Sequence, residues 1–148
     1  LLVPGVSLIH GVALKTSELN QMFNARVGLI WSPRSNVELY GETVNMTAVK
    51  QSGVLTALAP DWSPTGSDGL LSELKFAATW NAALESPVVD DLSLLNMATS
   101  NPAKLIHLDR RLGKLAEGYL ADLFVLRPKD IPSNADEAWI LTHATPAE

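Results

Sequence analysis

The sequence predicts an α/β fold with parallel strands, and three observations support this prediction. Short apolar runs at residues 6–9, 27–31 and 54–59 have the length and composition of buried strands. The segments between and after them carry apolar side chains at spacings of three and four, which is typical of amphipathic helices. Strands that alternate with helices in this way form parallel βαβ units.

The composition is that of one ordinary globular domain of 148 residues, 47% hydrophobic and 18% charged. This length is too short for a complete eight-stranded βα barrel, which needs roughly 250 residues. The net charge of -5 argues against a nucleic-acid surface, and no apolar run approaches the roughly 20 residues of a membrane span. Cysteine is absent, so any metal must be bound by His, Asp or Glu. We therefore expect a cytoplasmic protein without nucleic-acid or membrane partners.

The first unit begins with the strand at residues 6–9, which ends at His10. Thr16 or Ser17 is placed to cap the following helix, whose apolar face consists of Leu19, Met22 and Phe23. The apolar start of the chain, residues 1–14, has no basic residue ahead of its apolar stretch and is interrupted by Pro4 and Gly5, so it does not have the pattern of a signal peptide. The first residue is not Met, so we expect the chain to be part of a longer or processed protein.

The second and third units repeat this arrangement. Their predicted elements are, in order, a strand (27–31), a loop (32–36), a helix (44–51), a strand (54–59), a polar loop (60–67) and a helix that runs to about residue 84. Gly53 is expected to end the first of these helices. Ser67 is expected to cap the second one.

The predicted elements after these units are first helices and then, beyond Leu108, turns and a strand. Asp90 or Asp91 is expected to open a helix through Met97, and Asn101 followed by Pro102 predicts a short helix. The later predicted elements are turns at Gly113 and Gly118, a strand (121–126), a loop (128–134) and a segment that is either helix or strand (137–142). The chain is thus predicted to divide into an α/β part, residues 1–108, and a second part, residues 109–148.

Side chains with catalytic or ligand chemistry follow all three predicted strands. His10 follows the first strand, Ser35 and Asn36 follow the second, and Asp61 and Trp62 follow the third. In parallel α/β folds, ligands bind where the carboxyl ends of the strands meet. His and Asp side chains can bind a metal ion or transfer protons. A catalytic site at this edge of the sheet is therefore one interpretation of the sequence.

A structural interpretation of the same residues stands beside it. A single His after an apolar strand is most often structural, and an Asp in a loop with Pro, Ser and Gly is more often a turn residue. Ser35 and Asn36 can serve to cap backbone groups, and Trp62 can belong to the core or the rim. His107 is expected to be structural, and His143 to be structural or merely exposed. The residues alone predict only a parallel α/β unit with a polar edge.

Six segments in this order resemble motifs of the amidohydrolase superfamily, in particular its cytosine/guanine deaminase and chlorohydrolase-like branch. They are Ser-Leu-Ile-His-Gly-Val-Ala-Leu (7–14), Trp-Ser-Pro-Arg-Ser-Asn (31–36), Leu-Ala-Pro-Asp (58–61), Leu-Leu-Ser-Glu-Leu (70–74), Met-Ala-Thr-Ser-Asn-Pro-Ala (97–103) and Leu-Gly-Lys-Leu-Ala-Glu-Gly-Tyr-Leu-Ala-Asp-Leu (112–123). The first three resemble the sixth, seventh and eighth barrel strands of that family. The last resembles the return into its accessory β-sandwich.

The resemblance implies a fold and a chemistry. The chain would comprise the last three βα units of a TIM-type (β/α) barrel, with parallel strands, followed by part of an accessory β-sandwich. Asp61 would bind a divalent metal, zinc or alternatively iron, and take a proton from the metal-bound water that attacks a C–N bond of a small molecule. His10 would bind a second metal or orient the substrate. Ser35, Asn36 and Trp62 would shape the rim.

Departures from the family pattern bear on activity. Trp31 stands where many relatives have His, and Ala59-Pro60 replaces Gly-Thr before Asp61. The family's first-strand His-x-His pair and its fifth-strand His have no counterpart, and Asp61 and His10 fall short of the three protein ligands usual for catalytic zinc. We therefore expect an incomplete, inactive chain that associates as a homo-oligomer or with the missing N-terminal half, since its sheet would have unpaired edges.

Two other interpretations stay open at this point. The chain can be a non-enzymatic α/β module for binding or assembly, which needs no metal. It can also be an unrelated small doubly wound domain, which predicts a sheet closed by its own helices and no site that joins His10 to Asp61.

Overall fold

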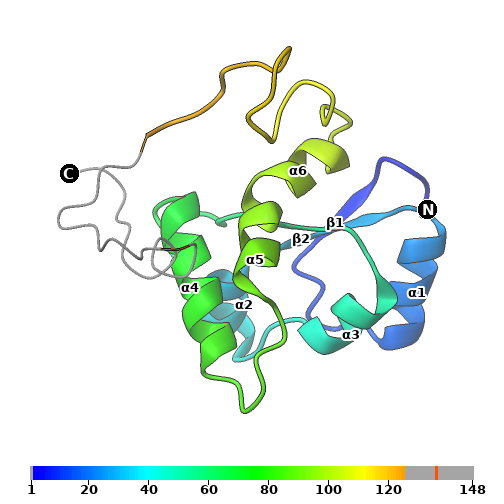
Figure 1. Ribbon diagram of the computed structural model, residues 1–148. Coiled ribbons are helices and arrows are strands. Elements are labelled where there is room, and N and C mark those ends of the chain that lie inside the picture. The colour runs from blue at the N-terminus through cyan, green and yellow to red at the C-terminus, as the bar shows by residue number, and fades with distance from the viewer. Residues whose placement is uncertain (1, 126–135, 137–148) are drawn as a thin grey trace.

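A parallel sheet of three strands forms the centre of the computed structural model, which describes residues 2–125 and residue 136 (Figure 1). The strands, in spatial order, are β1 (Ser7–Ile9), β2 (Gly28–Trp31) and β3 (Thr56–Leu58). Ile9 pairs with Ile30, and Ile30 with Ala57, both in parallel register. The predicted parallel α/β fold is confirmed, and the carboxyl ends of all three strands lie at one edge of the sheet.

Six helices accompany the sheet within the described residues: α1 (Thr16–Asn24), α2 (Pro33–Tyr40), α3 (Met46–Ser52), α4 (Leu70–Ala82), α5 (Asp91–Ala98) and α6 (Ser100–Leu105). Helix α1 packs against α3 and α2 packs against α4, so that the four form two separate groups (Figure 1). Helices α5 and α6 both contact β3, the edge strand opposite β1. None of the helices in the described part of the chain is long and apolar enough to cross a membrane.

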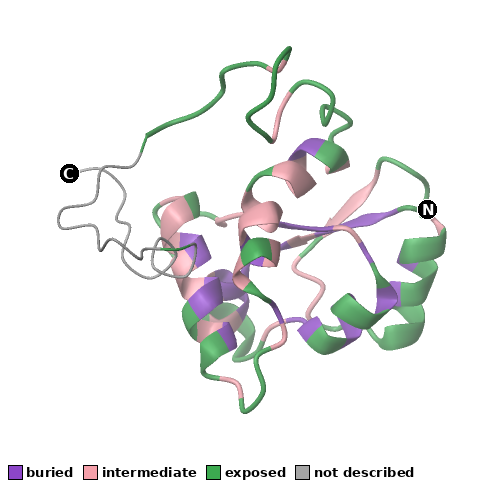
Figure 2. Cartoon of the chain, in the orientation of Figure 1, coloured by how far each residue is buried: buried purple, intermediate pink, exposed green. Residues whose placement is uncertain are grey.

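The core lies where the apolar faces of the strands and helices meet. Leu29 and Trp31 of β2 are fully buried, together with Leu19 and Met22 of α1. The ring of Trp31 meets the ring of Trp80 edge to face, with 5.5 Å between the centroids. Figure 2 shows the buried residues gathered along β2 and β3 and on the adjoining helix faces. Removal of this apolar surface from water is the dominant stabilising contribution to such a fold. The prediction of a buried first strand is wrong for its last residue, because Ile9 at the end of β1 is 59% exposed.

One segment that the sequence predicts as a loop is helical. The prediction for residues 32–36 rests on their Ser, Pro and Asn content, but α2 begins at Pro33. Proline fits the first position of a helix because its fixed φ is helical and its missing N–H would have no partner there. The difference matters for the site, since Ser35 and Asn36 lie on the first turn of a helix.

Two helix ends agree with the prediction and two differ from it. Gly53 ends α3 in the left-handed conformation with a φ of 74°, and the carboxylate of Asp90 caps α5. Neither residue predicted to cap α1 does so, because its N-cap is Lys15. Ser67 does not cap α4, because its hydroxyl instead accepts a hydrogen bond from Arg34 Nε.

The segment after α6, residues 106–125, contains turns but no helix or strand. The strand prediction is therefore wrong for residues 121–125. A strand needs a neighbouring strand for its N–H and C=O groups, and the described part of the chain offers none here. The remaining predicted features, which are residue 126, the loop at 128–134, the element at 137–142 and His143, lie outside the described residues.

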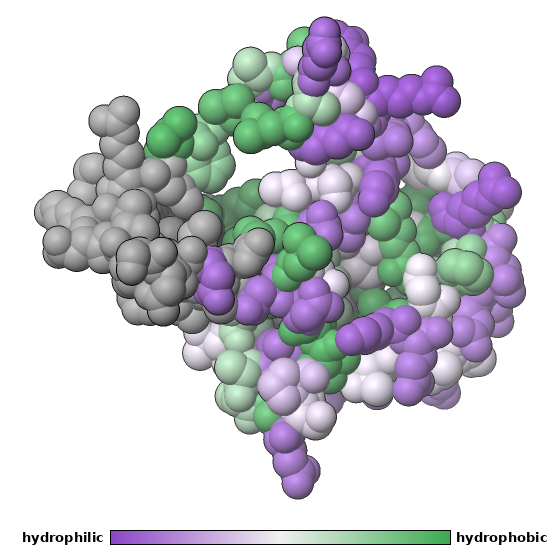
Figure 3. Space-filling view, in the orientation of Figure 1, coloured by the Kyte–Doolittle hydropathy of each residue, from purple (hydrophilic) through white to green (hydrophobic). Residues whose placement is uncertain are grey.

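Apolar side chains of this segment lie at the surface (Figure 3). More than half of each side chain is exposed at Leu115, Leu120, Leu123, Phe124 and Val125. A run of large exposed apolar residues is unusual for a soluble monomer and marks a surface that another part of a protein covers. The segment therefore leaves a larger share of its large hydrophobic residues exposed than the α/β body, residues 6–105, does.

Candidate functional site

The strand ends bring the predicted site residues together. His10 follows β1, Ser35 and Asn36 lie in α2 after β2, and Asp61 follows β3. His10 Nε2 lies 3.6 Å from Asp61 Oδ2, and Ser35 Oγ donates a hydrogen bond of 2.6 Å to the same oxygen. This geometry contradicts the unrelated doubly wound domain, which predicts no site joining His10 to Asp61. Trp62 stands beside them with its side chain exposed.

The backbone at His10 turns sharply out of the sheet. Its N–H still donates to Ile30 O at 2.9 Å, which continues the pairing of β1 with β2. The residue itself has a φ of 70°, in the left-handed region that costs a non-glycine residue about 1–3 kcal/mol, and Gly11 follows with 69°. The ring of Tyr40 lies edge-on to the imidazole, 6.3 Å between centroids. The turn thus leaves the imidazole among the side chains that follow β2 and β3.

Asp61 is held as a carboxylate by its hydrogen bonds. The Ser35 hydroxyl lowers the pKa of Asp61 below its ordinary value of 3.8, and the backbone N–H of Trp62, which donates to Oδ1 at 2.9 Å, lowers it further. Partial burial raises the pKa, and the charge of His10 contributes a smaller lowering. The hydrogen bonds outweigh the effect of burial, and the pKa of Asp61 is lowered overall, because they stabilise the ionised form directly. Asp61 therefore presents an anionic oxygen to His10 at neutral pH.

Behind His10 lies a buried amide. Asn36 is fully buried; its Oδ1 lies 2.8 Å from His10 Nδ1 and its Nδ2 donates to Thr43 Oγ1 at 2.9 Å. Trp31, also fully buried, donates its indole N–H to the same hydroxyl oxygen at 2.7 Å. The indole N–H is thus used inside the core and adds no polar group to the rim.

A buried carboxylate supports the start of α2. Glu73 of α4 is fully buried, and its Oε1 accepts the backbone N–H of Arg34 at 3.0 Å, a position where the helix dipole favours negative charge. The Arg34 guanidinium donates to Ser67 and lies 4.8 Å from the centroid of the Phe76 ring. Glu73 Oε2 has no hydrogen-bond partner within the described residues. These contacts tie α4 to the turn that carries Ser35.

Three residues next to the site are absent from the sequence prediction. Thr65 Oγ1 lies 3.3 Å from Ser35 Oγ, and Thr43 and Tyr40 make the contacts given above. A proline at the first helical position, Pro33, is the signal that reveals α2 and places Tyr40 in its last turn. The contacts of the two threonines depend on the path of loops, for which the sequence has no comparable signal.

His10 and Asp61 fit part of a metal site. Two ligand atoms about 2.1 Å from a tetrahedral zinc ion lie roughly 3.4 Å apart, close to the 3.6 Å between His10 Nε2 and Asp61 Oδ2. Within the described residues, however, no three His, Asp or Glu side chains are grouped so that they could hold a metal ion. A catalytic zinc usually has three protein ligands, so the residues present supply an incomplete set.

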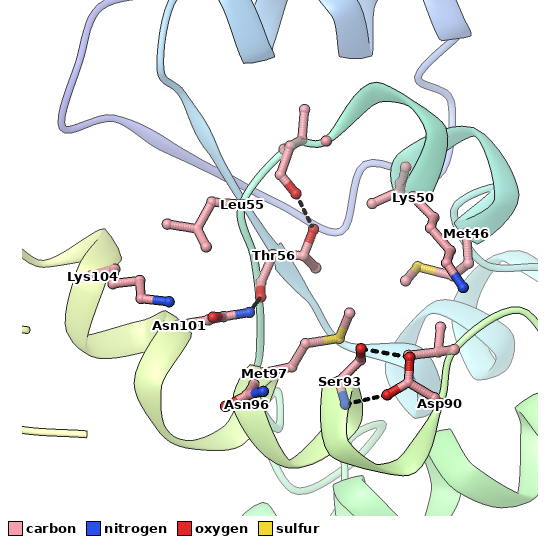
Figure 4. Close-up of a pocket in the computed structure, with 14 residues that line it drawn as sticks. Met46, Lys50, Leu55, Thr56, Asp90, Ser93, Asn96, Met97, Asn101 and Lys104 are labelled. Atoms are coloured by element: carbon pink, nitrogen blue, oxygen red, sulfur yellow. Dashed lines mark hydrogen bonds between the residues drawn. The ribbon is translucent and has the colours of Figure 1, made fainter. Parts of the chain in front are cut away.

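A cavity of about 320 Å³ lies at the end of β3 away from Asp61. Its wall comes from α3, α5, α6 and the start of β3 (Figure 4). Polar groups in the wall bond to one another: Asp90 accepts from Ser93, and Asn101 Nδ2 donates to Thr56 O at 2.9 Å. The wall includes none of the predicted site residues, so the chemistry at the strand ends does not extend into this cavity.

Comparison with known proteins assigns the family. A profile of the amidohydrolase family matches residues 5–143. The chain belongs to the amidohydrolase family. It is 30% identical over 141 residues to the 5-methylthioadenosine/S-adenosylhomocysteine deaminase of Pyrococcus furiosus, a match that covers 91% of this chain and 33% of that protein. The enzyme of the same name from Teredinibacter turnerae is 30% identical over 134 residues, which cover 88% and 30%. This amidohydrolase chain thus spans about a third of the length of these curated relatives.

Solved structures share its fold. An adenosine deaminase from Xanthomonas campestris with bound zinc superposes with a TM-score of 0.84 at 21% identity, over 96% of this chain and 34% of that one. The E. coli guanine deaminase gives 0.82 at 20% identity, over 95% and 36%. A mutant atrazine chlorohydrolase from Arthrobacter aurescens, complexed with zinc and atraton, gives 0.78 at 23% identity, over 96% and 33%. The resemblance seen in the sequence is confirmed, and two of these structures contain zinc.

Proposed function

We propose that this chain supplies the last three βα units of the barrel of a metal-dependent amidohydrolase, with His10 and Asp61 as part of its metal and water site. The observation that carries the proposal is the approach of His10 Nε2 to the ionised Asp61 at the strand ends, 3.6 Å apart. Family membership and the zinc in two similar structures support it. The complete enzyme would hydrolyse a C–N bond: water adds to the carbon, the bond to nitrogen breaks and the amine leaves.

Each residue of the rim then has a role. Asp61 and His10 would help to hold a divalent metal, with zinc favoured over iron, and the metal would supply the acidified water for the attack. Asp61, ionised at neutral pH, would ligate the ion, accept the proton of the attacking water and pass it to the leaving amine. Ser35 and the N–H of Trp62 hold the two carboxylate oxygens in place for this transfer. His10 would ligate a metal or orient the reacting carbonyl or ring.

The substrate class follows from the relatives and from one exposed side chain. The curated relatives are named as deaminases of 5-methylthioadenosine and S-adenosylhomocysteine, which favours hydrolysis of an amino group on a planar heteroaromatic ring. Trp62 is 66% exposed and directly follows Asp61. An indole in this position can stack on such a ring, while Ser35 and Asn36, both fully buried, would shape the rim by holding Asp61 and His10 from behind.

The chain by itself would be inactive, because it holds two of the usual three metal ligands. The missing ligands would come from a preceding N-terminal half or, in an assembly, from further copies. Within the described residues, β1 and β3 each have one edge without a partner strand, and the 106–125 segment exposes apolar residues. Both features favour association. In the complete protein, residues 1–108 would be the barrel part and residues 109–148 would belong to the accessory β-sandwich, although residues 109–125 form no strand in this chain.

Zinc binding to the purified chain tests this proposal directly. We expect weak binding by isothermal titration calorimetry, with loss of the heat signal in Asp61→Ala and in His10→Ala. Asp68→Ala is the matched control, since it removes an exposed carboxylate from the same loop. Inductively coupled plasma mass spectrometry should likewise find zinc in the unsubstituted chain and in Asp68→Ala, and less zinc in Asp61→Ala and His10→Ala. Equal zinc binding by all four proteins would contradict the proposed site and favour a non-enzymatic module.

Two further measurements test the proposed incompleteness. With zinc and 5-methylthioadenosine, the isolated chain should release no ammonia above background. Turnover that disappears in Asp61→Ala would overturn the inactivity while supporting the site. Light scattering at micromolar concentration should show a species larger than the 15.9 kDa chain; a monomer would contradict the proposed association.

A further inference from the structure

A continuous chain of hydrogen bonds lies behind the imidazole of His10. Trp31 Nε1–H donates to Thr43 Oγ1 at 2.7 Å, and Asn36 Nδ2–H donates to the same oxygen at 2.9 Å. On its other side, the Asn36 amide places Oδ1 2.8 Å from His10 Nδ1. Trp31 and Asn36 are fully buried, so water does not compete for these groups.

The partners of the Asn36 amide fix which way it faces. The two ends of an amide are told apart by their neighbours, because nitrogen donates and oxygen accepts. Nδ2 lies near two acceptors: Thr43 Oγ1 and, at 3.5 Å, the backbone oxygen of His10, which can only accept. A reversed amide would press Oδ1 against that carbonyl oxygen. Trp31 strengthens the assignment, since its N–H is a donor only and helps hold the Thr43 hydroxyl as an acceptor.

The orientation of the amide determines the tautomer of the imidazole. Because Asn36 Oδ1 only accepts, His10 Nδ1 must carry a hydrogen to bond with it. The neutral imidazole then has its lone pair on Nε2, which is the atom that faces Asp61 Oδ2 at 3.6 Å. A lone pair directed at an anionic oxygen is favourable only where a positive charge or a donor hydrogen lies between them.

We propose that Thr43 is a positioning residue, supported by Trp31, that orients the Asn36 amide and thereby fixes His10 as the Nδ1–H tautomer with its Nε2 lone pair directed into the site. Thr43 acts through Asn36 and touches no reacting atom. That the lone pair serves a metal or a substrate rests on the proposed function. The tautomer itself does not, and it can be measured in the chain without either.

The tautomer is read from ¹⁵N shifts in a long-range ¹H–¹⁵N correlation spectrum of the folded chain, at a pH where His10 is neutral. The signals are assigned with His107→Gln and His143→Gln, which remove the other two histidines of the chain. We expect His10 in the unsubstituted chain to carry its hydrogen on Nδ1. Thr43→Val, which keeps the shape and removes the hydroxyl, should shift the tautomer equilibrium about fivefold toward Nε2–H, the effect of one hydrogen bond.

Matched variants separate positioning from general structure. Thr43→Ser keeps the hydroxyl, so His10 in this variant should remain the Nδ1–H tautomer, as in the unsubstituted chain. Thr47→Val, on the exposed side of α3, should leave it unchanged. Should circular dichroism show Thr43→Val to be unfolded, Trp31→Phe, which removes only the indole N–H and one ring, decides the question with a smaller shift in the same direction.

Two results overturn the proposal. One is a His10 that carries its hydrogen on Nε2 in the unsubstituted chain. The other is a folded Thr43→Val or Trp31→Phe protein with an unchanged tautomer. Because neither readout involves zinc or turnover, a failure of zinc binding would reject the proposed function and leave this result standing, and the reverse also holds.

Discussion

The α/β body, residues 6–105, and the segment at 106–125 differ in how far they bury their apolar side chains. The body buries β2, β3 and one face of most helices, with Ile9 at the end of β1 exposed, whereas the segment leaves Leu115 and Val125 at the surface. Each strand of the body finds its neighbour one βα unit away, as β1, β2 and β3 lie in chain order. The segment has no strand beside it in the described residues. Parallel βα units thus pair strands that follow one another closely in the sequence, which favours their formation from local segments.

The same comparison explains why a partial site is already ordered. His10, Ser35 and Asp61 follow three consecutive strands, so the sheet of the body alone brings them within hydrogen-bonding or ion-pair distance. The body therefore holds these three side chains together, while the described residues offer no group of three His, Asp or Glu that could hold a metal ion.

The largest expected effect tests the contrast in burial itself. Leu94 of α5 is fully buried, while Leu115 is 81% exposed. Leu94→Ala should lower the free energy of unfolding by about 2–5 kcal/mol, through lost apolar burial and the cavity left behind. Leu115→Ala should change it by less than about 0.5 kcal/mol. Urea unfolding followed by circular dichroism measures both, and equal losses would mean that the segment is packed like the body.

A second prediction locates the boundary of the body at α6. A Cβ atom added to Gly28 would lie 2.2 Å from Leu105 Cδ2, because α6 lies against the sheet at this point. Gly28→Ala should therefore lower the free energy of unfolding, but by no more than about 1 kcal/mol, because the end of the Leu105 side chain can move aside. In a Leu105→Ala background the same substitution should cost less, which a double-mutant cycle detects. Strict additivity would show that α6 does not rest on β2.

A third prediction concerns the N-cap of α5, which contributes to the stability of the body through local hydrogen bonds. The Asp90 carboxylate accepts hydrogen bonds from the backbone N–H and the hydroxyl of Ser93, both at 2.8 Å. Asp90→Ala should lower the free energy of unfolding by about 1 kcal/mol at neutral pH, as expected for a lost N-cap. Asp91→Ala, which removes the next carboxylate and neither of these bonds, serves as the control.

The effect of Asp90 should depend on pH with a defined sign. The bonds from Ser93 lower the pKa of Asp90 below its ordinary value of 3.8. A carboxyl group with a lower pKa in the folded state stabilises the fold above its unfolded pKa, and this contribution is lost as the pH falls through the folded pKa. The unfolding free energies of the wild type and Asp90→Ala should therefore converge below about pH 4. A difference that stays constant with pH would contradict the capping role.

The smallest expected effect on stability tests whether the rim is formed in the body alone. Ser35→Ala removes the bond that lowers the pKa of Asp61 most, so this pKa should rise. A ¹³C-detected carboxyl titration of the chain measures it. Ser63→Ala, at an exposed position in the same loop, should leave it unchanged. If the pKa of Asp61 is the same in all three proteins, Ser35 and Asp61 are not in contact in solution.

Local pattern in the sequence was sufficient for most of the body. The three apolar runs predict the strands, Gly53 marks the end of α3 and Asp90 the start of α5. These signals depend on interactions within one turn or one strand, which neighbouring residues control. Composition misled at residues 32–36, where Pro33 begins a helix and the abundance of Ser and Asn suggests a loop.

The sequence by itself determined the parallel α/β class and which polar residues follow each strand, including His10 after the first strand and Asp61 after the third. Only the tertiary structure decided that the two side chains face each other, that Ser35 holds the carboxylate and that Thr43 stands behind Asn36. The physical reason is range. Periodicity and capping reflect forces between neighbours in the chain, whereas hydrogen bonds between residues 26 apart, such as His10 with Asn36, depend on how the sheet places whole units beside one another.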